Sequence, residues 1–174
     1  MPSDHKARER AFQDHIVNAL AHSGWLVGES ANYDRERALY PEDLLAYVQQ
    51  SQPEGWGKFC KTYGEEPERH LLNAAVRALE GQERGTLWLL RNQIEDRGHR
   101  LSVATFKPDH DLNPELTARY AMNRLRVVPE LIYSPHGYDG RLDLTLFLNG
   151  LPIATLELKS CFKQSLENAK QQYR

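Results

Sequence analysis

Three residues in the last third of the chain have the side chains of one catalytic task. Thirteen residues separate Asp143 from Glu157, and Lys159 follows Glu157 by two positions. Mg²⁺ is usually held by one or two carboxylates, and water and phosphate oxygens complete its octahedral shell. A bound metal can acidify a water and neutralise charge on a phosphate, while a lysine can orient that water or stabilise developing negative charge. These residue types therefore predict metal-assisted phosphodiester hydrolysis, with Asp143 and Glu157 as metal ligands.

The three residues belong to two apolar runs joined by Asn149-Gly150, a dipeptide typical of a β-hairpin turn. A strict two-residue turn would pair Leu148 with Leu151 and put the two carboxylates on opposite faces. An odd loop or a bulge reverses this parity and gathers the leucines of both strands on one face. We therefore expect a bulged turn whose glycine is left-handed. The pattern alone leaves open an ordinary amphipathic hairpin with a solvated polar face.

The segment from Tyr133 to Lys159 resembles the N-terminal nuclease region of the restriction (R) subunit of type I restriction-modification enzymes. The likeness covers roughly residues 65–174 and also includes Gly85-Thr-Leu, Asp96-Arg-Gly, Phe106-Lys-Pro, Leu112-Asn-Pro-Glu-Leu and Asn123-Arg-Leu. The resemblance implies the PD-(D/E)xK endonuclease fold, an α/β (α+β) class with a restriction-endonuclease-like mixed sheet flanked by helices. It places Asp143, Glu157 and Lys159 on the family's catalytic positions.

The resemblance also implies a function, a cofactor and partners. The expected function is that of a Mg²⁺-dependent endonuclease domain hydrolysing phosphodiester bonds in unmodified foreign DNA, with Mn²⁺ as a substitute metal. Double-stranded DNA and the methylation and specificity subunits are the expected partners. The full-length subunit would use ATP in a motor, but this chain contains no Gly-x-x-x-x-Gly-Lys-Ser/Thr and is not expected to bind ATP.

Two further residues are candidate accessory groups. Family members often carry Gln-x-x-x-Tyr after the catalytic lysine; Tyr173 is present here, but Ala169 stands four residues before it. Helix packing is the simpler role for Tyr173. Related nuclease folds can place a glutamate of the first helix near the metal, and Glu9 occupies such a helix; an acid favoured by the helix dipole is the simpler interpretation.

The chain is expected to divide into a helical part at residues 1–98 and a nuclease core at residues 99–174, truncated from a longer R subunit. Apolar periodicity predicts helices over residues 8–23, 41–50, 68–80, 86–96 and 114–123, strands over 101–106 and 127–133, and a closing helix from about residue 165. The inward-facing apolar residues are expected to be Phe12, Ile16, Ala19 and Leu20 in the first helix and Leu87, Leu90 and Ile94 in the fourth. Residues 53–67 read as a loop with a brief Trp56-Phe59-Tyr63 stripe that belongs to the core. We expect the sheet to have about four strands or more.

Composition agrees with a globular cytoplasmic protein, with 40% hydrophobic residues and a mean hydropathy of −0.66. The sequence has no apolar run of membrane-spanning length and no signal sequence, so no membrane partner is expected. Cys60 and Cys161 have neither disulfide-framework nor zinc spacing and are expected to be reduced. A net charge of −2 argues against strong autonomous DNA binding. Two clusters, Arg119, Arg124 and Arg126 before the hairpin and Lys159, Lys163, Lys170 and Arg174 after it, could form a DNA-facing rim or be ordinary surface charges.

Two other functions remain open from the sequence. A catalytically silent module could use the nuclease fold to dock DNA or the methylation and specificity subunits, although such a module would have no physical need for the carboxylates and lysine. A stand-alone nuclease is the other alternative, and the helical extension fits it less well.

Overall fold

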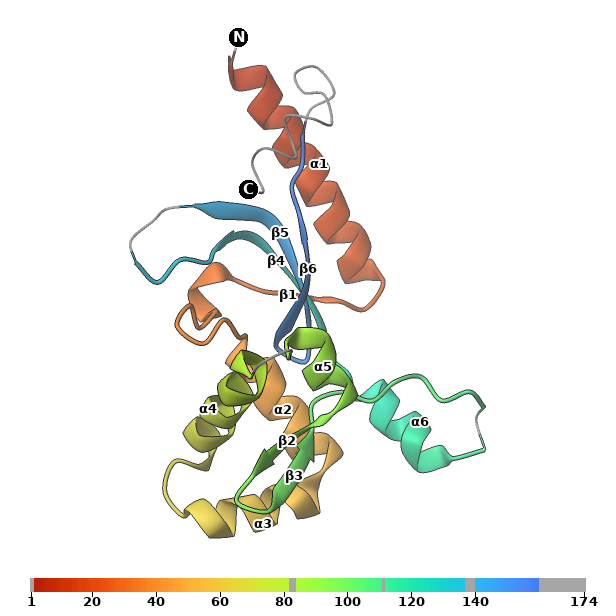
Figure 1. Cartoon of the computed structure of the whole chain (residues 1–174). Helices are drawn as coiled ribbons and strands as arrows, with labels where there is room; N and C mark the ends of the chain where they lie inside the picture. The colour runs from red at the N-terminus through yellow and green to blue at the C-terminus, as the bar shows by residue number, and fades with distance from the viewer. Residues whose placement is uncertain (1, 82–83, 111, 137–139, 160–174) are drawn as a thin grey trace.

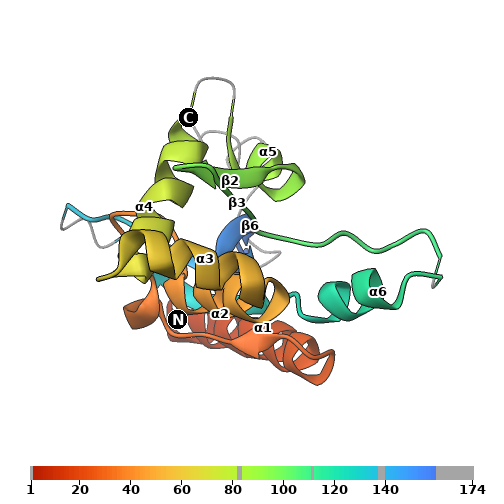
Figure 2. The same cartoon turned by 90° about the horizontal axis from the view of Figure 1, so that it is seen from below.

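The computed structural model describes residues 2–81, 84–110, 112–136 and 140–159 and shows an α+β protein. Helix α1 runs beside a four-stranded sheet, and helices α2 to α5 form a lobe below it together with a separate two-stranded sheet (Figure 1). Seen from below, α1 and the α5–β2–β3 layer lie on opposite sides of β6, while α6 projects sideways on a long connection (Figure 2). The expected fold class, with helices concentrated in the N-terminal half, is confirmed.

The helices begin where proline or a capping residue allows them to. Proline occupies the first turn of α2, α3, α4 and α6, where its missing N–H costs no hydrogen bond. Asn113 caps α6 by accepting a hydrogen bond from the Leu116 N–H. The helical segments are α1 (Pro2–His22), η1 (Ser30–Asn32), α2 (Pro41–Ser51), α3 (Pro53–Tyr63), α4 (Pro67–Glu80), α5 (Thr86–Arg91) and α6 (Pro114–Ala121).

The main sheet has the strand order β1-β4-β5-β6 and is mixed, because β1 is parallel to β4 while the other neighbours are antiparallel. Its strands are β1 (Leu26–Val27), β4 (Leu125–Ile132), β5 (Arg141–Leu148) and β6 (Leu151–Leu156). Strand β5 lies in the interior of the sheet, which is why both of its faces carry buried residues. The expectation of a mixed sheet with four strands is therefore confirmed.

The expected helix over residues 86–96 is wrong in its second half. Helix α5 ends at Arg91, and β2 (Gln93–Asp96) pairs with β3 (His99–Ser102) as a small antiparallel sheet. Arg97 and Gly98 both have positive φ, the signature of a two-residue hairpin turn. The expected strand over residues 101–106 is thus shorter and belongs to this second sheet. Its hairpin turn was missed because an arginine rarely adopts the left-handed conformation.

Two other sequence predictions fail locally. Residues 53–63 form helix α3 instead of a loop, since two glycines are tolerated in a helix that packs through buried Phe59. The Trp56-Phe59-Tyr63 stripe does belong to the core, as expected. In contrast, Phe12 and Ala19 of α1 and Leu87 of α5 are exposed, because each helix turns a different face toward its neighbours.

The buried apolar residues form two clusters. The larger cluster fills the helical lobe and joins α2–α5 to β2, β3 and the start of β6 at Leu151. It includes residues from both sides of residue 98, the position at which the sequence was expected to divide into a helical part and a nuclease core. The smaller cluster surrounds Phe147 of β5, whose ring contacts the rings of Tyr33 and Tyr40 at centroid distances of 5.8 Å. The sheet and the lobe therefore have separate apolar centres.

An ion-pair network links the lobe to the sheet. Asp43, in the first turn of α2, is fully buried and accepts hydrogen bonds from Arg124 Nε at 2.7 Å and from Arg126 Nε at 2.6 Å. Its hydrogen bonds to Arg126 raise the pKa of that guanidinium, which also lies over the Tyr40 ring. Two of the three arginines before the hairpin are therefore structural, whereas Arg119 is exposed on α6. The interpretation of this cluster as ordinary surface charges therefore does not hold for Arg124 and Arg126, whose side chains are largely buried.

We expect Asp43→Ala to lower the free energy of unfolding by about 3 kcal/mol or more, because it leaves two largely buried guanidiniums without their main carboxylate. Urea denaturation measures the change. The matched control is Glu42→Ala, which removes an exposed carboxylate contacting the same arginines at 3.2 and 3.4 Å and should cost less than about 1 kcal/mol. Equal losses in the two variants would contradict a structural role specific to the buried carboxylate.

Candidate active site at the end of the β5–β6 hairpin

The turn that joins β5 to β6 is a strict two-residue turn. Asn149 and Gly150 have φ values of 48° and 80°, and Leu148 pairs with Leu151. Both central residues are thus left-handed, as a type I′ turn requires, and the Asn-Gly dipeptide favours that conformation. The expectation of a bulged turn at Gly150 is wrong.

The parity change occurs further along β6 instead. Phe147 pairs with Pro152, but Leu146 pairs with Ala154, so Ile153 is an extra residue opposite β5. This β-bulge shifts the register by one residue and reverses which side chains share a face. The sequence argument correctly required an odd residue but placed it at the turn. Asn149-Gly150 forms a regular two-residue turn, and the extra residue lies within strand β6.

The register beyond the bulge brings the two carboxylate residues alongside each other. Leu144 is paired with Leu156, so the same register continued by one residue sets Asp143 opposite Glu157. The Leu158 N–H donates to Asp143 Oδ2 at 2.5 Å, which ties the aspartate to the segment between Glu157 and Lys159. Lys159 Nζ lies 3.4 Å from Glu157 Oε1. The hairpin therefore gathers all three sequence-predicted residues at its open end.

Helix α1 supplies a second wall of this site. Gln13 is nearly buried and donates from Nε2 to the backbone carbonyl of Asp143 at 2.8 Å. Glu9 lies one helical turn earlier on the same face. A cavity of about 280 Å³ is lined by Glu9, Arg10, Gln13, Glu130 and Asp143. The accessory candidate Glu9 thus lies in the same cavity as Asp143.

Gln13 and Glu130 were not found from the sequence. The i, i+4 spacing from Glu9 to Gln13 could have predicted that they share a face. Glu130 gives no such signal: it reaches the cavity from β4, opposite Asp143, with a φ of 50° that breaks the regular strand. Its carboxylate is 3.8 Å from Arg141 Nη1. The open end of the hairpin is accordingly rich in carboxylates.

The carboxylates of Asp143 and Glu157 suit a metal ion that takes only one or two ligands from the protein. In the part of the chain that the structure describes, no three His, Cys, Asp or Glu side chains are grouped closely enough to hold an ion. Mg²⁺ does not require such a cage, because one or two carboxylates with water and phosphate oxygens complete its shell. Asp143 and Glu157 remain the residues that could hold it. Tyr173 and Ala169 lie outside the described residues.

We expect Gly150→Ala to destabilise the fold more than Gly98→Ala. Both glycines have φ near +80° in hairpin turns, so alanine is strained at each by about 1 kcal/mol. A Cβ at Gly150 would additionally overlap the backbone carbonyl of Tyr40, whereas the space around Gly98 is open. Urea denaturation of both variants isolates the cost of the overlap. Equal destabilisation would show that the turn is not confined by α2.

Comparison with known protein families gives a match over the C-terminal part of the chain. The family of the type I restriction enzyme R protein N terminus matches residues 70–174, which is more than half of the chain. The chain belongs to this family, and the resemblance drawn from the sequence motifs over roughly residues 65–174 is confirmed. No curated protein and no solved structure gives a significant match. The matched region contains the whole β5–β6 hairpin but not helix α1.

None of the helices among the described residues has the length and apolar character needed to cross a bilayer.

Proposed function

We propose that this chain is the Mg²⁺-dependent endonuclease region of a type I restriction R subunit and hydrolyses phosphodiester bonds in unmodified foreign DNA. The observation that supports the proposal is the bulge at Ile153, which sets Asp143 opposite Glu157 and so on the same face of the hairpin, in a chain of this family. Without the bulge, the same sequence would separate the two carboxylates by the thickness of the sheet.

The roles of the residues follow from their chemistry. Asp143 and Glu157 would hold Mg²⁺, which supplies charge neutralisation at the phosphate and acidifies a water. Gln13 holds the Asp143 backbone by its hydrogen bond to the carbonyl, and the Leu158 N–H holds one oxygen of the Asp143 carboxylate. These two contacts fix the aspartate from both sides. The second carboxylate oxygen, Oδ1, is then the natural metal ligand.

Lys159 has a separate task. Its ammonium lies beside Glu157 and is partly exposed, with 39% of its side chain accessible. From its place beside Glu157, the Lys159 ammonium can therefore hydrogen-bond to a water or a phosphate oxygen that enters the site. A positive charge at that point stabilises the negative charge that develops on the phosphate during hydrolysis.

The family also supports a wider assembly. Within a complete R subunit, DNA would reach this region together with the methylation and specificity subunits, while ATP would serve a motor elsewhere in that protein. Tyr173 would be an accessory residue following the catalytic lysine. Glu9 would act from α1, either on the metal's water shell or by raising the negative potential of the cavity.

Mn²⁺ or Mg²⁺ should stabilise the folded chain, because the metal relieves repulsion among the carboxylates at the open end of the hairpin. The expected gain is about 1.4 kcal/mol at about tenfold excess of metal over Kd. Thermal melting over a millimolar Mn²⁺ series measures it. Asp143→Asn should lose the gain while its remaining amide oxygen can still accept from Leu158.

Glu115→Ala is the control for charge removal alone, since Glu115 is an exposed acid of α6. It should retain the wild-type response to the metal. If all three proteins respond identically, Asp143 does not bind the metal.

Lys159→Met should lower metal-dependent cleavage of double-stranded DNA by the assembled enzyme at least about a hundredfold, because the charge that stabilises the reacting phosphate is lost. Assembly and ATP hydrolysis should be unchanged. A plasmid-cleavage assay with a parallel ATPase assay separates these effects. Full cleavage by the variant would favour a module that docks DNA or the other subunits without cutting.

A further inference from the structure

The helical lobe contains a second polar cavity, which shares no lining residue with the cavity beside Asp143. It has a volume of about 620 Å³ and lies between α4, α5, the β2–β3 sheet and the segment after β3. This volume is typical of pockets that bind small ligands, which span roughly 300–1,000 Å³. The residues lining this arginine pocket include Arg77, Arg84, Trp88, Arg91, Asn92, Gln93, Glu95 and Phe106.

The pocket is positively charged although the chain is not. Three arginines and one glutamate line it, and that glutamate, Glu95, is already paired with Arg100 at 3.0 Å. Arg77 contacts Asp96 through a single nitrogen at 3.1 Å. Arg84 and Arg91 have no carboxylate partner among the described residues. A concave surface with uncompensated guanidiniums favours an anion with several oxygens, because guanidinium binds phosphate in a bidentate manner.

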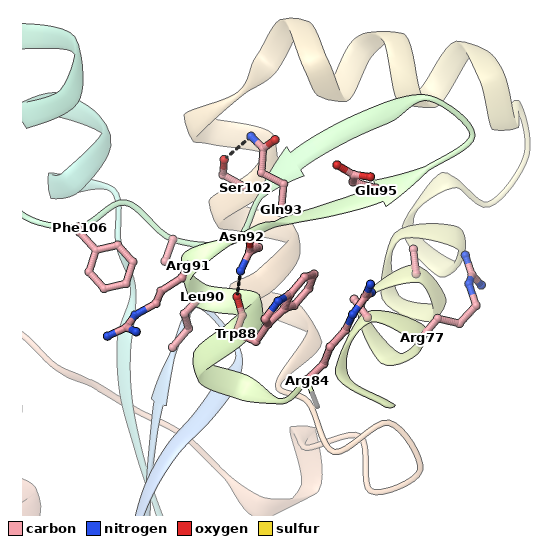
Figure 3. A pocket seen from close by; sticks show the side chains of 13 residues that line it. Arg77, Arg84, Trp88, Leu90, Arg91, Asn92, Gln93, Glu95, Ser102 and Phe106 are labelled. Atoms are coloured by element: carbon pink, nitrogen blue, oxygen red, sulfur yellow. Dashed lines mark hydrogen bonds between the residues drawn. The ribbon is translucent and has the colours of Figure 1, made fainter. Parts of the chain in front are cut away.

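Aromatic rings lie among these charges. Figure 3 shows the three arginines along one rim of the pocket, with Trp88 between Arg91 and Arg84. The Arg84 guanidinium lies 4.3 Å from the Trp88 ring centroid, so cation–π attraction holds it in place. Phe106 lies next to Arg91 in Figure 3 and is 57% exposed. An exposed aromatic ring beside arginines is the arrangement on which an unpaired base stacks while its phosphates are neutralised.

Two amide side chains complete the wall. Asn92 donates from Nδ2 to the Trp88 carbonyl at 2.8 Å, and Gln93 donates from Nε2 to Ser102 Oγ at 3.0 Å (Figure 3). Both amides are thereby oriented, and the carbonyl oxygen of each is left as an acceptor. A few fixed polar groups in a pocket with aromatic surface give orientation and specificity to a bound ring.

We propose that the arginine pocket binds a nucleotide, with its phosphates on Arg84 and Arg91 and its unpaired base against the aromatic side chains. The base can belong to a free nucleotide or to a single strand of nucleic acid, since both present the same chemistry. The pocket is separate from the residues around Asp143. It does not depend on the proposed metal site.

The test is isothermal titration calorimetry of the chain with three probes: pyrophosphate, ADP and the trinucleotide d(AAA). We expect ADP or d(AAA) to bind at least about tenfold more tightly than pyrophosphate, because stacking adds to the phosphate contacts. Tighter binding of ADP identifies a free nucleotide as the ligand, and tighter binding of d(AAA) identifies a strand. Absence of binding by ADP and d(AAA), or equal binding of all three probes, would overturn the proposal.

The double variant Arg84→Gln/Arg91→Gln should weaken binding of the preferred probe by at least about tenfold. Both arginines are exposed, so the melting temperature should change little. The matched control is Arg35→Gln/Arg69→Gln, which removes two exposed arginines outside the pocket and should bind normally. Asp143→Asn should also bind normally, which separates this result from any failure of the nuclease proposal. Unchanged binding by Arg84→Gln/Arg91→Gln would rule the pocket out.

Discussion

The rest of the fold depends on a hairpin turn that is buried instead of exposed. The side chain of Asn149 is fully buried and makes three hydrogen bonds: it accepts from the Arg124 N–H at 2.6 Å and donates to Val103 O and Asn123 Oδ1 at 2.9 and 2.8 Å. Buried polar groups must be satisfied, or each costs about 1–3 kcal/mol. The turn therefore determines where two other segments of the chain, one at Val103 and one at Asn123 and Arg124, meet the hairpin.

The backbone of the turn adds a connection to a further segment. The Gly150 carbonyl accepts from the Tyr40 N–H at 2.8 Å, at the point where α2 begins. This bond sets the end of the sheet against the helical lobe, and the ion pairs of Asp43 with Arg124 and Arg126 lie in the same first turn of α2. A charge network and a backbone contact thus act on one junction. The two apolar clusters are joined by polar interactions that define one relative placement.

Charge is divided between the two ends of the molecule. Carboxylates of α1, β4 and β5 line the small cavity beside Asp143 together with Arg10, and Glu157 follows on the next segment. Arg77 of α4, Arg91 of α5 and Arg84 of the segment between these helices line the larger cavity in the lobe. Under the two proposals, the site beside Asp143 would take a cation and the arginine pocket would take an anion, because a concentration of like charges attracts ligands of the opposite charge.

The sequence by itself determined the local and chemical features. Asn149-Gly150 specifies its own turn, prolines set the starts of four helices, and the combination of short sequence motifs over roughly residues 65–174 was enough to find the family. Tertiary structure alone decided the features that depend on distant neighbours: the bulge at Ile153, the approach of Gln13 to Asp143, and the burial of Arg126 beside Asp43. A side chain's type is local, but its register and burial are set by packing against segments about a hundred residues away. The exposed face of α1 shows the same limit, because its apolar stripe predicted burial of Phe12 while the sheet selected the face that carries Gln13.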